Sequence, residues 1–123
     1  MIDDFENETF TGWTAEGGAF SKGPNKGTIG EQRPVAAYFG EQLVNTFVSG
    51  DESTGTLLSK PFTIERTFVN FRIGGGLHPG ETGMDLLVEG ETVRTATGHA
   101  HGGGDSEHLR WHSWDVSEFE GHE

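Results

Sequence analysis

The chain contains no cysteine, which excludes disulfide bonds and thiolate metal sites. Cationic residues are scarce, since eight Lys and Arg stand against 20 Asp and Glu, giving a formal net charge of −12. Phosphate binding needs clustered Lys and Arg, so nucleic acid and anionic membranes are poor partners for this surface. No apolar run approaches the length of a membrane span, and the N-terminus lacks the charged-then-apolar pattern of a signal peptide.

Helical patterns are also missing, whereas glycine is abundant. Twenty glycines in 123 residues favour tight turns and oppose long helices. Nine Phe and three Trp supply bulk for a core, although apolar residues are only 32% of the chain. The length suggests one domain spanning 1–123. These features predict an all-β protein.

The clearest strand pattern lies in the stretch Thr67–Thr97. Phe68–Ile73 alternates as a strand would and ends at a run of three glycines. Met84–Val88 is the second predicted strand. Glu89-Gly90-Glu91 then turns the chain tightly into a third, Thr92–Thr97. We take these three strands as the centre of the domain.

Other alternating segments extend this pattern to about eight short strands, a number and spacing typical of a β-sandwich or jelly roll of the galactose-binding-like type. Glycine- and proline-rich loops separate them. No closing strand follows Trp114, so we expect the fold to lack its last strand or strands. The additional predicted strands are 12–17, 35–39, 43–48, one strand of 56–59 and 62–65 interrupted at Pro61, and 109–114, and the main loops are 23–34, 49–55 and 98–107.

Several motifs together resemble a known family over nearly the whole chain. The resemblance is to the non-catalytic β-sandwich module of levanases and fructan β-fructosidases in glycoside hydrolase family 32, comparable to carbohydrate-binding module family 66. The glycine-rich and VRTATG motifs are the most specific. The motifs are Asp4-Phe5-Glu6 with Gly12-Trp13-Thr14, Thr54–Leu57 with Ser59–Ile64, Asn70–Gly80, Val93–Gly98 and Leu109–Ser117.

The resemblance implies an accessory module that binds fructan of the levan or inulin type, or braces an adjacent catalytic domain. It implies a longer parent that is secreted or periplasmic. The family pattern continues into another strand after the Trp114 region, so we expect a partial module. The 99–107 loop is longer and richer in His and Gly than the family pattern.

Sugar recognition requires planar polar groups that match paired hydroxyls, and arginine offers a fixed fork of donors. Asn70 and Arg72 share one face of a strand because side chains alternate with a period of two. The 74–80 and 98–107 loops are expected at one end of the sheet, close to Thr97 and Asp51. The predicted carbohydrate-binding residues are Asn70, Arg72, His78, Arg94 and Glu107. The alternative for Arg72 and Arg94 is a surface salt bridge.

Two further features have a structural and a functional interpretation. Trp13, Trp111 and Trp114 are interpreted as core residues rather than sugar platforms, since large aromatics at alternating positions pack. Asp4 and Glu6 are candidate ligands for a structural Ca²⁺, which modules of this type often hold. Calcium takes six to eight oxygen ligands, so two carboxylates do not complete a site.

Two alternative functions stay open. The histidines at 99, 101, 108 and 112 could gather around zinc in a metal-dependent hydrolase or a metal-binding protein. A purely structural interaction domain would bind no sugar. A glycosidase needs two carboxylates fixed across the scissile bond, and no acidic pair here lies in a recognisable catalytic context. We therefore expect no enzymatic activity.

Overall fold

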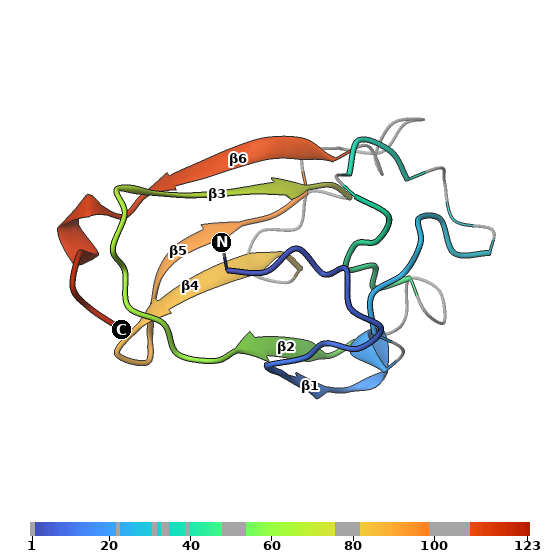
Figure 1. Ribbon diagram of the computed structural model, residues 1–123, viewed down its shortest axis with the longest axis horizontal. Helices are drawn as coiled ribbons and strands as arrows, with labels where there is room; N and C mark the ends of the chain where they lie inside the picture. The colour runs from blue at the N-terminus through green and yellow to red at the C-terminus, as the bar shows by residue number, and fades with distance from the viewer. Residues whose placement is uncertain are drawn as a thin grey trace. The chain divides into compact units, whose positions relative to one another are not determined.

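The computed structural model is all-β, with six strands, two short 3₁₀ helices and no α-helix among the residues it describes (Figure 1). None of the described helices is long and apolar enough to cross a membrane. The chain divides into two compact units, Met1–Lys60 and Pro61–Glu123, which are treated separately below. The structure describes residues 2–21, 23–30, 32, 35–38, 40–47, 54–75, 82–98 and 109–123.

The first unit contains one antiparallel ribbon. Strand β1 (Trp13–Glu16) pairs with β2 (Thr56–Ser59), with Trp13 opposite Ser59 and Glu16 opposite Thr56. The 3₁₀ helix η1 (Gly18–Phe20) follows β1 directly. These strands match the alternating segments 12–17 and 56–59, so both predictions are confirmed.

A buried asparagine organises the long loops of this unit. The Asn45 side chain is only 6% exposed and forms a reciprocal amide pair with Gln32, through bonds of 2.8 and 3.1 Å. Its Nδ2 also donates to the Gly27 carbonyl at 3.0 Å, and its Oδ1 accepts from the Phe47 amide at 3.0 Å. The amide is therefore satisfied on every side, and it fastens the 23–34 loop to 43–47.

The predicted strands 35–39 and 43–48 are wrong where the structure describes them. Residues 35–38 and 43–47 belong to no strand, apart from isolated bridges such as Asn25 to Leu43. Ala37 has a φ of 66°, which a strand cannot accommodate. In the 43–47 segment, the Asn45 side chain bonds to backbone groups of Gly27 and Phe47, and these bonds take the place of regular strand-to-strand hydrogen bonds.

The second unit consists of two antiparallel ribbons (Figure 1). Strand β3 (Phe68–Ile73) pairs with β6 (Arg110–Asp115), and β4 (Met84–Val88) pairs with β5 (Glu91–Ala96). The bounds of β3 and β4 agree with the predicted strands. The three strands of the Thr67–Thr97 stretch do not pair in sequence order, because β3 takes its described partner, β6, from the far end of the chain.

A two-residue turn joins β4 to β5. Glu89 and Gly90 have φ values of 53° and 85°, and Val88 faces Glu91 across the turn. Positive φ at both central residues defines a type I′ hairpin, whose twist suits the flanking strands. The sequence predicted this turn at Glu89-Gly90-Glu91, one residue longer than observed.

The two ribbons of the second unit share one apolar core. Val116 is fully buried, and Trp114 of β6 is 5% exposed. The partly buried side chains of β3, the strand paired with β6, also pack against this core. Two antiparallel ribbons that enclose a common core are consistent with a β-sandwich. The buried members are Ile64, Leu86, Val88, Ala96, Trp114 and Val116.

The 62–65 segment is not a strand, although the sequence predicted one. Instead, the Ile64 amide donates to the His122 carbonyl at 2.9 Å, and the Gly121 amide donates to the Ile64 carbonyl at 2.8 Å. The 3₁₀ helix η2 (Ser117–Phe119) turns the chain back toward this contact. Pro61 removes one backbone donor next to the segment, which disfavours a regular ladder.

Replacing Asn45 with leucine should destabilise the first unit by about 1–3 kcal/mol, because the partners of the amide become buried and unsatisfied. Urea unfolding followed by far-UV circular dichroism measures the change. Asn7→Leu is the matched control at an exposed position. An Asn45 variant as stable as this control would contradict the role assigned to the amide.

Candidate functional site

Strand alternation gives the β3–β6 ribbon two different faces. Val69, Phe71 and Ile73 pack against the core, so the intervening residues of β3 point the other way. Each is paired across the ribbon with a residue of β6 on the same face. We call this surface the outer face. Its cross-strand pairs are Phe68 with Asp115, Asn70 with Ser113, and Arg72 with Trp111.

An exposed tryptophan dominates the outer face. Trp111 is 59% exposed, and the guanidinium carbon of Arg72 lies 4.7 Å from the centroid of its indole ring. This is a cation–π contact, which fixes both side chains on the strand surface. The interpretation of Trp111 as a core residue is wrong. Trp114 does lie in the core, and Trp13 is half-buried with its Nε1 donating to Asp3 at 2.6 Å.

The spacing of Trp111 and Trp114 in the sequence already indicates that the two side chains point to different faces of β6. Trp111 and Trp114 are three positions apart, and residues an odd number of positions apart in a strand point to opposite faces. Only one of them could therefore reach the core. Sequence reasoning also missed Phe68 and Ser113 as members of the outer face. The period of two could have found Phe68, which alternates in phase with Asn70 and Arg72, whereas Ser113 depends on pairing between β3 and β6.

The structure places Asn70 and Arg72 together, as predicted, on one face of β3. The Asn70 Oδ1 accepts a hydrogen bond of 2.5 Å from the Ser113 hydroxyl. This bond leaves the two N–H donors of the Asn70 amide without a partner among the described residues. An exposed indole thus lies one cross-strand pair away from an amide that can donate to a ligand.

Arg94 is engaged elsewhere. Its Nε and NH2 groups donate to the Asp115 carbonyl at 3.2 and 3.0 Å, and NH2 also pairs with Glu118. Its guanidinium lies 5.1 Å from the centre of the Phe119 ring. Arg94 therefore ties β5 to the end of β6 and to η2. The salt bridge that was its alternative interpretation is present, and its carbohydrate-binding role stays a prediction.

Exchanging Arg94 for lysine tests which role dominates. Lysine keeps the charge but loses the planar fork, so we expect the second unit to lose about 1–2 kcal/mol of stability. Thermal unfolding of Arg94→Lys beside a Lys60→Arg control measures this. A stable variant with weakened glycan binding would instead assign Arg94 to ligand recognition.

Hydrogen bonds from Ser117 hold the pKa of Asp115 below its usual value, and Arg94 adds a smaller electrostatic effect. The Asp115 Oδ1 accepts from the Ser117 hydroxyl at 2.7 Å and from the Ser117 amide at 3.0 Å. The ionised carboxylate is the stronger acceptor, so these bonds favour it, and they help to shape the start of η2.

The lowered pKa means that ionised Asp115 stabilises the folded chain. This contribution is fully present above the ordinary pKa range of aspartate, about pH 4, and is lost as pH falls through the folded-state pKa. Asp115→Asn should therefore flatten the fall in stability as the solution is acidified below about pH 4. Denaturant midpoints across this range measure the effect, with Glu65→Gln as the control. Parallel pH profiles for Asp115→Asn and the parent chain would refute it.

The candidate calcium ligands contact backbone amides. Both Glu6 carboxylate oxygens accept from the Glu41 amide, at 3.1 and 3.0 Å, and Oε1 also accepts from Gln42 at 3.0 Å. Asp4 accepts from the Glu6 amide. In the described ranges no three His, Asp or Glu side chains are grouped to hold a metal. The role of Asp4 and Glu6 as calcium ligands therefore stays a prediction.

Several predicted site residues lie outside the described residues. These are His78, Glu107, Asp51 and three of the four zinc-candidate histidines. The fourth, His112, packs its ring against Phe71 at 5.2 Å between centroids. The predicted grouping of the 74–80 and 98–107 loops also falls largely on residues outside the described ranges, so it stays a prediction. Met84 at the start of β4 faces Ala96 at the end of β5, and Ile73 faces Arg110.

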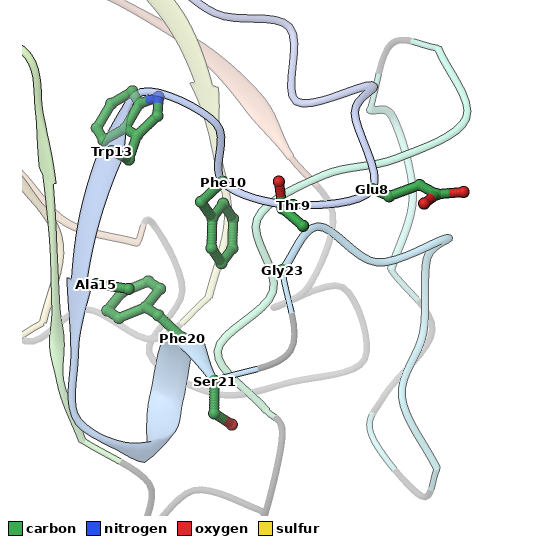
Figure 2. Close-up of a pocket in the computed structure, with 8 residues that line it drawn as sticks. All are labelled: Glu8, Thr9, Phe10, Trp13, Ala15, Phe20, Ser21 and Gly23. Atoms are coloured by element: carbon green, nitrogen blue, oxygen red, sulfur yellow. The ribbon is translucent and has the colours of Figure 1, made fainter.

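A cavity of about 350 Å³ lies in the first unit. Figure 2 shows Phe10, Phe20 and Trp13 on its wall, with the Glu8 side chain extending away from the rings. Its hydroxyl groups are already bonded within the protein, since Thr9 contacts Thr11 and Ser21 donates to Gly18. Phe10 and Phe20 pack edge to face, 6.2 Å apart. The two hydroxyl groups on the cavity wall are therefore engaged within the protein, and its rings supply an apolar surface.

A comparison with known proteins links the chain to a protein whose name describes a glycosyl hydrolase. No protein-family model and no solved structure matches the sequence. A protein of Aspergillus rugulosus named "Putative glycosyl hydrolase ecdE" is 40% identical over 124 residues. That match covers 98% of this chain but only 17% of the relative. The chain is therefore related to a small segment of a much longer protein.

Proposed function

We propose that this chain is a non-catalytic carbohydrate-binding module associated with a glycoside hydrolase, and that the outer face is its binding surface. The main support for this proposal is the exposure of Trp111. Its side chain is 59% exposed, and the Arg72 guanidinium lies over its ring. Aromatic rings pack against the apolar faces of sugar rings, and nearby amides and guanidinium groups donate to hydroxyls. Asn70 supplies such an amide one pair away.

Fructan of the levan or inulin type is the proposed ligand. The relationship to a named glycosyl hydrolase supports a polysaccharide context. The family 32 resemblance of the glycine-rich and VRTATG motifs supports the finer choice of fructan. A neutral polymer also suits a chain with a net charge of −12, which would repel anionic polysaccharides. A secreted or periplasmic parent carrying an adjacent catalytic domain belongs to the same proposal.

We also propose that the outer face does not catalyse hydrolysis, because of the side chains that it carries. Hydrolysis of a glycosidic bond requires an acid and a second carboxylate on opposite sides of that bond. The outer face carries one carboxylate, Asp115, whose Oδ1 is bound to Ser117. The face can position hydroxyl groups through its amide and guanidinium but offers no paired acid and base.

Affinity electrophoresis in gels containing levan or inulin tests the proposal. The chain should be retarded, and Trp111→Ala should abolish the retardation because the stacking surface is removed. Asn70→Ala and Arg72→Ala should each weaken binding about tenfold, the effect of one lost hydrogen bond to a charged or well-placed donor. No reducing sugar should be released from either polymer.

Leu87→Ala is the control, since Leu87 is 42% exposed on β4 and lies off the outer face. It should migrate like the parent chain. If the parent is retarded and Trp111→Ala is retarded equally, the binding surface is misplaced. If the parent is not retarded by levan, inulin or a panel of other neutral polysaccharides, the carbohydrate-binding function itself is wrong.

A further inference from the structure

We infer that the outer face binds an internal stretch of an extended glycan chain, over several sugar rings, rather than a single sugar residue at a chain end. This inference rests on the proposed carbohydrate-binding function. It follows from a second exposed aromatic on the same face. Phe68, at the first position of β3, is 54% exposed.

The two exposed aromatics lie near opposite ends of the outer face. Trp111 is paired with Arg72, four positions along the ribbon from Phe68. A strand rises about 3.3 Å per residue, which separates the two positions by roughly 13 Å. That distance exceeds the width of one sugar ring. A monosaccharide can therefore contact only one of the two aromatic side chains.

The surface between the two aromatics is polar. Asn70 and Ser113 form the cross-strand pair that separates them, joined by the hydrogen bond between their side chains. Their remaining donors and acceptors point from the pleated surface in the same direction as both rings. An oligosaccharide laid along the ribbon would stack one ring at each end and place the hydroxyls of a middle ring over the Asn70 amide.

Exposed apolar surface of this kind has a cost in water that a ligand can remove. Among the described residues, five large hydrophobic side chains are exposed, and two of them lie on this one face. They are separated by polar residues instead of forming one continuous apolar patch. This spacing fits a repeating polymer with alternating apolar faces and hydroxyl groups better than it fits an apolar protein surface.

Isothermal titration calorimetry with inulin- and levan-type oligosaccharides of one to six residues tests the inference. Affinity should rise by about tenfold or more once the chain is long enough to reach both rings, the amount expected from one added stacking contact. A cyclic inulin oligosaccharide, which has no chain ends, should bind as well as a linear one of equal length.

Variants separate the two contacts. Phe68→Ala should remove the gain in affinity with chain length while leaving the weak binding of short oligosaccharides. Trp111→Ala should remove both, and Leu87→Ala should change neither. Near-UV circular dichroism of each variant confirms that the core around Trp114 is intact, so that lost binding is not lost folding.

The outcomes distinguish this inference from the function on which it rests. If a monosaccharide binds as tightly as a hexasaccharide, or the cyclic compound does not bind, the outer face recognises chain ends and the inference is overturned. If Phe68→Ala retains the full length dependence, Phe68 is not the second contact and the inference fails as stated. If no oligosaccharide of any length binds, the carbohydrate-binding function fails with it.

Discussion

The burial of one face of the β3–β6 ribbon is the constraint on which the rest of the second unit depends. Trp114 and Val116 lie in a core that is closed on its other side by Leu86, Val88 and Ala96 of the β4–β5 hairpin. Side chains of a strand alternate between faces, so anchoring one set in this core forces the other set outward. The outer face is a direct consequence of this packing. It requires no loop to position its residues.

This origin gives the candidate site a rigid base. The cation–π contact between Arg72 and Trp111 and the hydrogen bond between Ser113 and Asn70 both cross the same ribbon. Arg94 and Asp115 act at the end of β6, where they hold η2 and the returning C-terminal segment. Stabilising groups and candidate binding groups therefore occupy different parts of one short element. Sites built on strands hold their geometry more closely than sites built on loops.

Much of the second unit could be predicted from the sequence, and much of the first could not. Regular alternation bounded by glycine located β3 and β4, because both strands bury one face. The 43–48 segment alternates in the same way, yet the buried amide of Asn45 ties it to a loop. Local patterns also could not show that β3 pairs with β6, since that contact joins segments about 40 residues apart.

The candidate site was predicted in part for the same reason. The period of two placed Asn70 and Arg72 on one face without knowledge of the partner strand. A large aromatic residue type favours the core for Trp111, whereas its odd spacing from Trp114 places the two side chains on opposite faces. The hydrogen-bond partners of Arg94 could not be predicted from the sequence, because Asp115 and Glu118 come close to it only after the two ribbons pack together.

The most direct test of a ligand surface on the outer face is an NMR titration of the three indole N–H signals with a levan or inulin oligosaccharide. The three tryptophans occupy different environments, since Trp111 is exposed, Trp13 donates to Asp3 and Trp114 is buried. The account predicts that the Trp111 signal shifts in a saturable manner while the other two stay in place. A saturable shift confined to Trp13, or no shift of Trp111 under conditions where the oligosaccharide binds, would contradict it.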